Sequence, residues 1–305
     1  MANTNIMISV KNLVKKYDDF TAVKGISFDV YENEIFGLLG PNGAGKTTTL
    51  EIIETLREKT SGQVMVDGFD IETDADEIKQ RIGVQLQAAG YYPNLNLSEL
   101  IELFCGLYGI DKSPMEMLEK VALTDKAKSK YKELSGGQKQ RFSIATTLIN
   151  NPRIVFLDEP TTGLDPNQLV EIRELIKNIG KDKTVFLSTH IMQEVEAICD
   201  RVIIINHGKI VTDKKLKNLV KDTKLEQIIE VEFDKAVAEA LLLTIPNLTA
   251  AKNTRANNWE LTFNTETDMR PAMFDFAHDN GLKTLQLSLK NKNLESVFRE
   301  MTKKK

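Results

Sequence analysis

The chain has 305 residues, of which 41% are hydrophobic and 28% are charged, and its formal net charge is −4 at pH 7. This length allows about two domains, and the composition is that of a globular protein rather than a disordered one. The slightly negative charge argues against a nucleic-acid-binding protein, which needs a basic face, so we expect no nucleic-acid partner.

Two cysteines, Cys105 and Cys199, are present without a CxxC pair, which argues against a disulfide framework and fits a reducing cytosol. Both lie in helical patterns, where we expect ordinary buried side chains. The N-terminal residues lack the apolar core of a signal peptide, and no run approaches the roughly 18 apolar residues that cross a bilayer. We therefore expect a soluble protein that reaches a membrane only through a partner.

The first part of the chain predicts strands. Hydrophobic and polar residues alternate between Met7 and Val30, as in a half-buried antiparallel sheet. The apolar run "IFGLLG", Ile35–Gly40, predicts a strand buried on both faces. Further buried strands are predicted at Ile154–Leu157 and Thr184–Leu187. Because helical patterns lie beside these strands, we expect a parallel, doubly wound sheet.

Helical patterns dominate between about residues 88 and 150. The segments Asn96–Ile110 and Ser113–Leu123 predict helices, with Pro114 tolerated in a first turn. We interpret this region as a helical insertion in the α/β domain. The segment "RVIIINHGKIVT" after it predicts a hairpin that turns at Asn206, His207 and Gly208.

The last part of the chain changes character. Strand and helix patterns occur in the order βαββαβ, which predicts a small ferredoxin-like domain. Its strands are expected at Ile228–Phe233, Thr249–Lys252, Trp259–Phe263 and Leu282–Leu289, and its helices at Ala236–Leu243 and Met269–Ala277. The segment "NLESVFREM", Asn293–Met301, has the spacing of an amphipathic helix. We expect this domain to be a dimer-stabilising or regulatory appendage, because it shows no catalytic or metal-binding pattern.

A phosphate-binding loop follows the buried strand at Ile35. The residues "GPNGAGKT" fit the pattern GxxxxGK[ST] and precede a helical pattern. Such a loop turns successive N–H groups toward phosphate oxygens at a helix N-terminus. Lys46 is expected to reach the β and γ phosphates, and Thr47 to supply a hydroxyl to Mg²⁺. The predicted nucleotide-binding residues of this loop are Gly40, Pro41, Asn42, Gly43, Ala44, Gly45, Lys46, Thr47 and Thr48.

The segment "RIVFLDEP" supplies acids at the end of a strand. Asp158 is placed to hold Mg²⁺ through water, and Glu159 to orient and deprotonate an attacking water. Two acids at a strand end are by themselves more often a solvated terminus. The nearby phosphate loop favours the functional interpretation.

A second glycine-rich stretch opens a helical pattern far downstream. It consists of Leu134, Ser135, Gly136, Gly137 and Gln138. Because "LSGGQ" lies upstream of "IVFLDEP", the chain resembles the ATPase subunit of an ATP-binding-cassette (ABC) transporter, over roughly residues 5 to 220. A kinase-like or RecA-like enzyme has no reason to carry this stretch. In the family two chains pair head to tail, and this signature loop closes on the partner's γ-phosphate.

Other family marks occur in order, and their roles are those that the resemblance implies. Tyr17 matches an aromatic that stacks on adenine; the alternative is that it only packs on an edge strand. Gln87 matches the glutamine loop that senses Mg²⁺ and meets the membrane subunit, with Gln85 as the competing residue. Asp165 matches the D-loop that crosses between subunits, and His190 matches the switch histidine near the γ-phosphate.

The resemblance implies a P-loop NTPase cassette at residues 1–222: an α/β fold with a mixed sheet, an antiparallel β subdomain and a helical insertion. Residues 223–305 would form the small α+β domain. The expected cofactors are ATP and Mg²⁺. The expected partners are polytopic membrane permease subunits and a second cassette, identical or paralogous, on the cytoplasmic face of the cell membrane.

The accessory domain resembles that of the type-2 exporter class, so the implied function is ATP hydrolysis that powers export. The alternative is a soluble ABC-type ATPase that acts on ribosomes, nucleic acid or cluster assembly.

Overall fold

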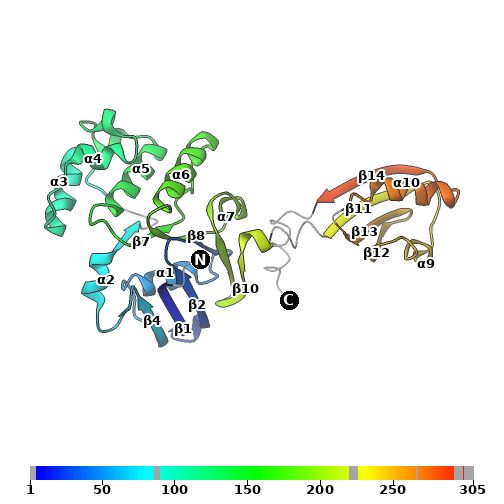
Figure 1. Cartoon of the computed structure of the whole chain (residues 1–305), viewed down its shortest axis with the longest axis horizontal. Helices are drawn as coiled ribbons and strands as arrows, with labels where there is room; N and C mark the ends of the chain where they lie inside the picture. Colours follow the sequence, from blue (N-terminus) through cyan, green and yellow to red (C-terminus); the bar gives the residue numbers. More distant parts are fainter. Residues whose placement is uncertain (1–4, 86–89, 220–225, 266, 292–297, 299–305) are drawn as a thin grey trace. The chain divides into compact units, whose positions relative to one another are not determined.

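The computed structural model describes residues 5–85, 90–219, 226–265, 267–291 and 298. The chain divides into two compact units, Met1–Lys215 and Leu216–Lys305 (Figure 1). The boundary expected at residues 222 and 223 lies outside the described residues, as does the expected helix at Asn293–Met301 apart from Phe298. Within the described ranges, no helix is both long and apolar enough to span a bilayer.

A four-stranded antiparallel sheet begins the first unit, with the order β2-β1-β4-β5. The alternating pattern in the sequence produces it, because inward side chains such as Val10, Leu13 and Val30 are buried while their neighbours are more exposed. Its strands are β1 (Ile6–Tyr17), β2 (Phe20–Tyr31), β4 (Ser61–Val66) and β5 (Phe69–Asp70).

A six-stranded sheet with the order β10-β9-β3-β8-β7-β6 forms the centre of the first unit. All its neighbouring strands are parallel except β10, which forms the predicted hairpin with β9. Every residue of β3, β7 and β8 is buried, as their apolar runs predicted. The strands are β3 (Ile35–Leu39), β6 (Ile82–Gln85), β7 (Ile154–Asp158), β8 (Thr184–Thr189), β9 (Arg201–Asn206) and β10 (Lys209–Lys215).

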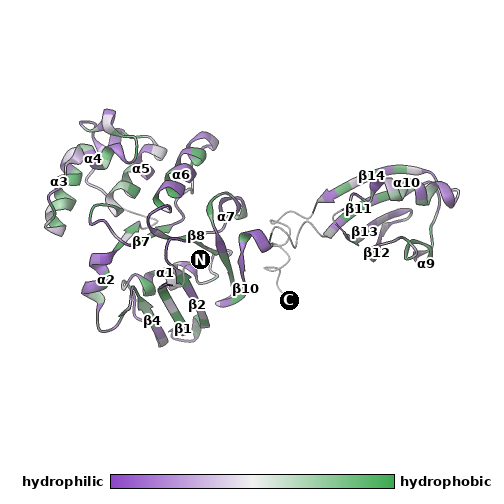
Figure 2. Cartoon of the chain, viewed as in Figure 1, coloured by the Kyte–Doolittle hydropathy of each residue, from purple (hydrophilic) through white to green (hydrophobic). Residues whose placement is uncertain are grey.

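Four helices of the first unit connect strands of these sheets. They are α1 (Lys46–Ile53), α2 (Ala75–Arg81), α6 (Pro166–Ile179) and α7 (Met192–Ile198). Hydrophobic and hydrophilic residues alternate along α6 in Figure 2, in keeping with its buried Ile172, Ile176 and Ile179.

The helical insertion holds α3 (Leu97–Tyr108), α4 (Pro114–Glu119) and α5 (Gly136–Thr147). The helix predicted to run to Leu123 stops at Glu119. The backbone at Ala122 has a φ of 51°, which is incompatible with continuing the helix.

Where the structure describes residues 226–291 of the second unit, they form a four-stranded antiparallel sheet with the helices α9 and α10, in the order βαββαβ. Its strand order β12-β13-β11-β14 puts the first strand between the third and the fourth, as in a ferredoxin-like fold. The helix predicted at residues 236–243 is confined to α9, because Ala238 is still extended. The elements are β11 (Glu226–Phe233), α9 (Glu239–Leu242), β12 (Leu248–Arg255), β13 (Asn258–Asn264), α10 (Arg270–Asp279) and β14 (Thr284–Asn291).

Candidate active site

The phosphate loop joins the end of β3 to the start of α1, and close backbone contacts require its glycines. A Cβ on Gly40 would lie 2.4 Å from the carbonyl oxygen of Ile205. Gly45 has a φ of 104°, and a Cβ there would lie 2.7 Å from the carbonyl oxygen of Ala22. The amide of Gly40 also donates to the carbonyl of Thr189 at 3.3 Å, which ties the loop to the end of β8.

A cavity of about 400 Å³ opens above this loop. That volume is within the range of small-molecule sites. The predicted Tyr17, Lys46 and Glu159 all line it, whereas Phe20 and Ala22 line it without having been predicted. The complete lining is Tyr17, Phe20, Ala22, Asn42, Gly43, Gly45, Lys46, Thr47, Thr48 and Glu159.

Tyr17 and Phe20 give the cavity an aromatic wall at the β1–β2 turn, where the two residues pair across the hairpin. The Phe20 side chain is 62% exposed, which is unusual for a phenylalanine. Tyr17 is partly buried, and the cations of Lys15 and Arg57 lie 5.1 and 5.4 Å from its ring centroid. The hairpin register therefore brings a second aromatic to the position expected for Tyr17 alone.

The Lys46 ammonium is buried within its own loop. Its Nζ donates to the carbonyl oxygen of Gly40 at 2.9 Å and lies 3.7 Å from Glu159 Oε1. Burial lowers the pKa of Lys46, while the charges of Glu159 and Asp158 act in the opposite direction. The ammonium is thus held among oxygen acceptors at the floor of the cavity.

Oxygen atoms from three elements, α1, β7 and β8, meet beside Lys46. Thr47 Oγ1, at the start of α1, donates to Asp158 Oδ2 at 3.5 Å. The Ser188 hydroxyl of β8 donates to Asp158 Oδ1. Burial raises the pKa of the Asp158 carboxyl, and the Ser188 hydrogen bond opposes that rise. A hydroxyl and a carboxylate are the oxygen donors that Mg²⁺ prefers.

Glu159 and His190 meet at the ends of adjacent strands. His190 Nδ1 lies 3.0 Å from Glu159 Oε1, and the Thr162 hydroxyl donates to Glu159 Oε2 at 3.1 Å. The backbone of Glu159 has a φ of 48°, in the left-handed region that non-glycine residues rarely adopt. Such local strain is typical of functional positions. The Glu159 side chain thereby faces the cavity while Asp158 stays in the strand.

The two glutamines proposed for the glutamine loop differ in what the structure describes. Gln87 lies outside the described residues. Gln85 ends β6, pairs with Leu157 of β7 and is 4% exposed. Its Oε1 is buried and accepts no hydrogen bond within the described part of the chain.

The signature residues lie at the N-terminus of α5. Ser135 caps this helix: the Gln138 amide donates to the Ser135 hydroxyl at 3.3 Å, and the Ser135 amide donates to Gln138 Oε1 at 3.0 Å. Leu134 and Gly137 are buried, whereas Ser135 and Gly136 are exposed. None of these described residues lines the phosphate-loop cavity of the same chain.

Asp165 begins the next helix, and its carboxylate accepts from the amides of Asn167 and Gln168, both at 3.0 Å. The side chain is therefore the N-cap of α6. A Cβ on the signature residue Gly137 would lie 2.8 Å from the Gln168 side chain. The start of α6 therefore packs directly on the signature loop.

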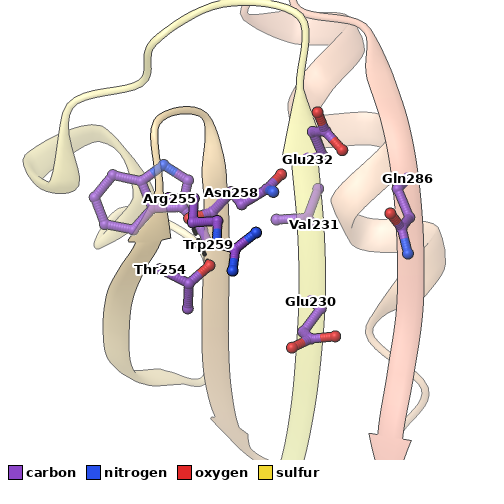
Figure 3. Close-up of a pocket in the computed structure, with 8 residues that line it drawn as sticks. All are labelled: Glu230, Val231, Glu232, Thr254, Arg255, Asn258, Trp259 and Gln286. Atoms are coloured by element: carbon purple, nitrogen blue, oxygen red, sulfur yellow. Dashed lines mark hydrogen bonds between the residues drawn. The ribbon is translucent and has the colours of Figure 1, made fainter.

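A second cavity, of about 300 Å³, lies in the second unit (Figure 3). It is lined by side chains from all four strands of the sheet, among them Glu232, Asn258 and Gln286. These three residues pair across β13, β11 and β14. Its lining contains no glycine loop, and the described residues of the chain hold no cluster of three or more metal-ligating side chains. The phosphate-loop cavity is therefore the better candidate for the active site.

Comparison with known proteins agrees with this geometry. The family described as "ABC transporter" matches residues 23–162. The linearmycin resistance ATP-binding protein LnrL of Bacillus subtilis is 33% identical over 306 residues, which cover 97% of this chain and 98% of that protein. The chain belongs to the ABC transporter family. Within that family it is an ATP-binding subunit with ATPase activity.

Other members of the ABC transporter family match the chain either over nearly its whole length or over the cassette alone. The Nod factor export ATP-binding protein I of Ralstonia nicotianae is 32% identical over 97% of this chain and 94% of its own length. The dimeric structure of MJ0796, a bacterial ABC transporter cassette, is 32% identical with a TM-score of 0.63. It covers 69% of this chain and 99% of that cassette. A post-hydrolysis state of MJ0796, bound to ADP and Pi, is also dimeric and matches with the same TM-score.

Proposed function

We propose that this ATPase powers export through separately encoded membrane subunits, to which it binds on the cytoplasmic face of the membrane. The observation that carries the proposal is the extent of the match to LnrL, which spans both units of the chain. A Nod factor export protein matches over nearly the same extent. Since this similarity includes the small second unit, it supports the exporter class more specifically than the cassette does.

In the proposed reaction, the phosphate loop and Lys46 hold the triphosphate, and a water attacks the γ-phosphorus. The bond from that phosphorus to the oxygen bridging to the β-phosphate breaks, so that ADP and inorganic phosphate are released. Glu159 accepts the proton of that water, and His190, hydrogen-bonded to Glu159, keeps the carboxylate oriented. Thr47 and Asp158 would hold Mg²⁺, together with Gln87. The ion would neutralise charge on the phosphate oxygens. Tyr17, with Phe20, would contact the adenine.

The signature loop would act on the nucleotide of a second chain. Leu134–Gln138 open α5 and do not line the cavity of their own chain, yet Ser135 and Gly136 are exposed at a helix N-terminus. Such an N-terminus favours an anion. Two cassettes, identical or paralogous, would therefore bury ATP between them, and Asp165 would lie close to the subunit boundary. The dimeric MJ0796 cassettes support this arrangement.

Substitution of the general base tests the proposal. Glu159→Gln should lower kcat by roughly 10²–10⁴-fold, the usual effect of losing a positioned base, while ATP still binds. ATP and Mg²⁺ should then convert the variant to a dimer in size-exclusion chromatography with light scattering. Lys46→Ala is the matched control, since it should lose tight ATP binding and stay monomeric. Normal turnover by Glu159→Gln would contradict the role given to Glu159.

The membrane partner is tested separately. The full chain should co-purify with a polytopic membrane protein when the two are expressed together. A soluble ABC-type ATPase would instead co-purify with ribosomes, nucleic acid or a cluster-assembly complex. That result would exclude the export function and leave the ATPase assignment intact.

A further inference from the structure

One buried carboxylate next to the active site belongs to none of the sequence motifs. Glu194 lies in α7 and is 1% exposed. The hydroxyl of Thr161 donates to its Oε1, and the hydroxyl of Thr189 donates to its Oε2 at 2.6 Å. Both threonines are themselves buried, so these bonds are shielded from water.

The two donors lie close in sequence to the proposed catalytic pair, Thr161 in the loop after β7 and Thr189 at the end of β8. Thr161 lies two residues after Glu159, on the segment that leads to Asp165. Thr189 directly precedes His190, and its carbonyl accepts from the first amide of the phosphate loop. Glu194 therefore connects the loop after β7 to the end of β8 through a single side chain.

Keeping a carboxylate in this position is costly, because burial disfavours its charged form. Burial raises the pKa of Glu194, and the Thr189 hydroxyl, Arg173 and His190 oppose that rise, whereas Glu159 adds to it. An uncharged residue would avoid this cost but could not accept hydrogen bonds from both hydroxyls in the same way. A buried polar group with all its partners satisfied fixes the geometry of the elements it joins.

We propose that Glu194 is a positioning residue that sets the placement of His190 relative to Glu159. It lines no part of the cavity, and it acts through Thr189 at the end of β8 and through Thr161 in the loop after β7. The separation that it maintains is the 3.0 Å contact between His190 Nδ1 and Glu159 Oε1. This inference rests on the proposed roles of Glu159 and His190.

Three substitutions in the full chain test it. Thr161→Val and Thr189→Val keep the shape of the side chain and each remove one hydroxyl, and Glu194→Gln keeps the size and removes the charge. Each variant should lower kcat roughly 10-fold, the loss expected from one hydrogen bond to a charged group. The dissociation constant for ATP should stay within about 2-fold, because Lys46 and the phosphate loop are untouched.

A double-mutant cycle shows whether Glu194 and Thr161 act through one shared connection or affect kcat independently. If Glu194 makes this connection, then Thr161→Val should lower kcat little further once Glu194→Gln is present. If the double variant instead lowers kcat by the product of the two single factors, the proposal is wrong. Glu116→Gln is the matched control, because that carboxylate lies on α4 and pairs only with exposed Lys120 among the contacts described; its kcat should be that of the wild type.

The outcomes distinguish this inference from the function on which it rests. If Glu159→Gln is inactive but the Glu194 and threonine variants have wild-type kcat with only a lower melting temperature, Glu194 is merely structural and the inference fails alone. If Glu159→Gln hydrolyses ATP normally, the catalytic roles and this inference fail together.

Discussion

Glu54 is a buried carboxyl at the end of α1, with an exposed fraction of 3%. Burial, together with the negative charges of Asp158 and Glu51, raises its pKa to about 8. Its Oε1 is buried and accepts no hydrogen bond within the described residues. The carboxyl therefore stays protonated in the folded chain at neutral pH, where an unfolded glutamate is charged.

This difference predicts how stability depends on pH. The folded state binds the proton more tightly, so the contribution of Glu54 is fully present below about pH 4.5 and is lost as the pH rises to about 8. Glu54→Gln should match the wild type at pH 4.5 and exceed its free energy of unfolding by ~1 kcal/mol or more at pH 8.5. Urea unfolding at several pH values checks this. A difference that does not change with pH would show that Glu54 is charged in the folded chain.

The aromatic wall makes a second prediction for single residues. Because Tyr17 and Phe20 line the same cavity, Tyr17→Ala and Phe20→Ala should each weaken ATP binding, by roughly 5- to 100-fold if each ring contacts the base. Titration calorimetry with ATP and with inorganic triphosphate separates base from phosphate contacts, since triphosphate affinity should not change. If Phe20→Ala binds ATP like the wild type, Tyr17 alone serves the adenine.

At the scale of elements, the packing of β6 on α5 depends on Gly83. A Cβ there would lie 2.0 Å from the carbonyl oxygen of Thr147, a backbone atom at the end of α5. Gly83→Ala should therefore lower the free energy of unfolding by roughly 1–3 kcal/mol. Gly106→Ala in α3 is the matched control, since a Cβ there has nothing within 4 Å and alanine favours a helix. Equal melting temperatures for the two variants would contradict the close approach.

The same elements show what the sequence could and could not predict. The buried strands β3, β7 and β8 follow from their apolar runs, and the βαββαβ order of the second unit follows from alternating patterns. The strand β6 has no apolar run, because its four residues include Gly83 and end in the polar Gln85. Its neighbours β7 and α5 hold it in place, and that information is tertiary.

Some residues of the site could be predicted and others could not, for a similar reason. Lys46, Thr47, Asp158 and Glu159 belong to contiguous motifs, and the structure brings them together. Phe20 joins them through the register of a hairpin, and Glu194 through its hydrogen bonds to Thr161 and Thr189. Neither relation is visible as a spacing in one sequence, so sequence reasoning missed both residues.

At the scale of the whole molecule, the two units have separate hydrophobic cores. One core contains residues from Met7 to Ile205 and the other residues from Ile229 to Ala277. The sole tryptophan of the chain, Trp259, is buried in the second core. Its fluorescence therefore reports the second unit alone.

Nucleotide should thus stabilise the two units unequally. ATP at 100 times its dissociation constant should add ~2.7 kcal/mol to the stability of the first unit. The thermal transition followed by far-ultraviolet circular dichroism should move upward in its larger component, while that of Trp259 fluorescence stays in place. The Lys46→Ala variant controls for effects of ATP that do not depend on binding. A parallel rise in both midpoints would mean that the two units unfold together.

The cap at the start of α5 has one more consequence. The Ser135 oxygen accepts from the Gln138 amide, so its own proton remains available to point outward, and the first amides of α5 are oriented alike by the helix. In the proposed dimer, a phosphate bound to the other chain would meet donors that are already aligned. Little of the chain would then have to become ordered when the phosphate binds. The pace at which two cassettes close should then be governed by how often they collide in the correct orientation, rather than by rearrangement of this loop.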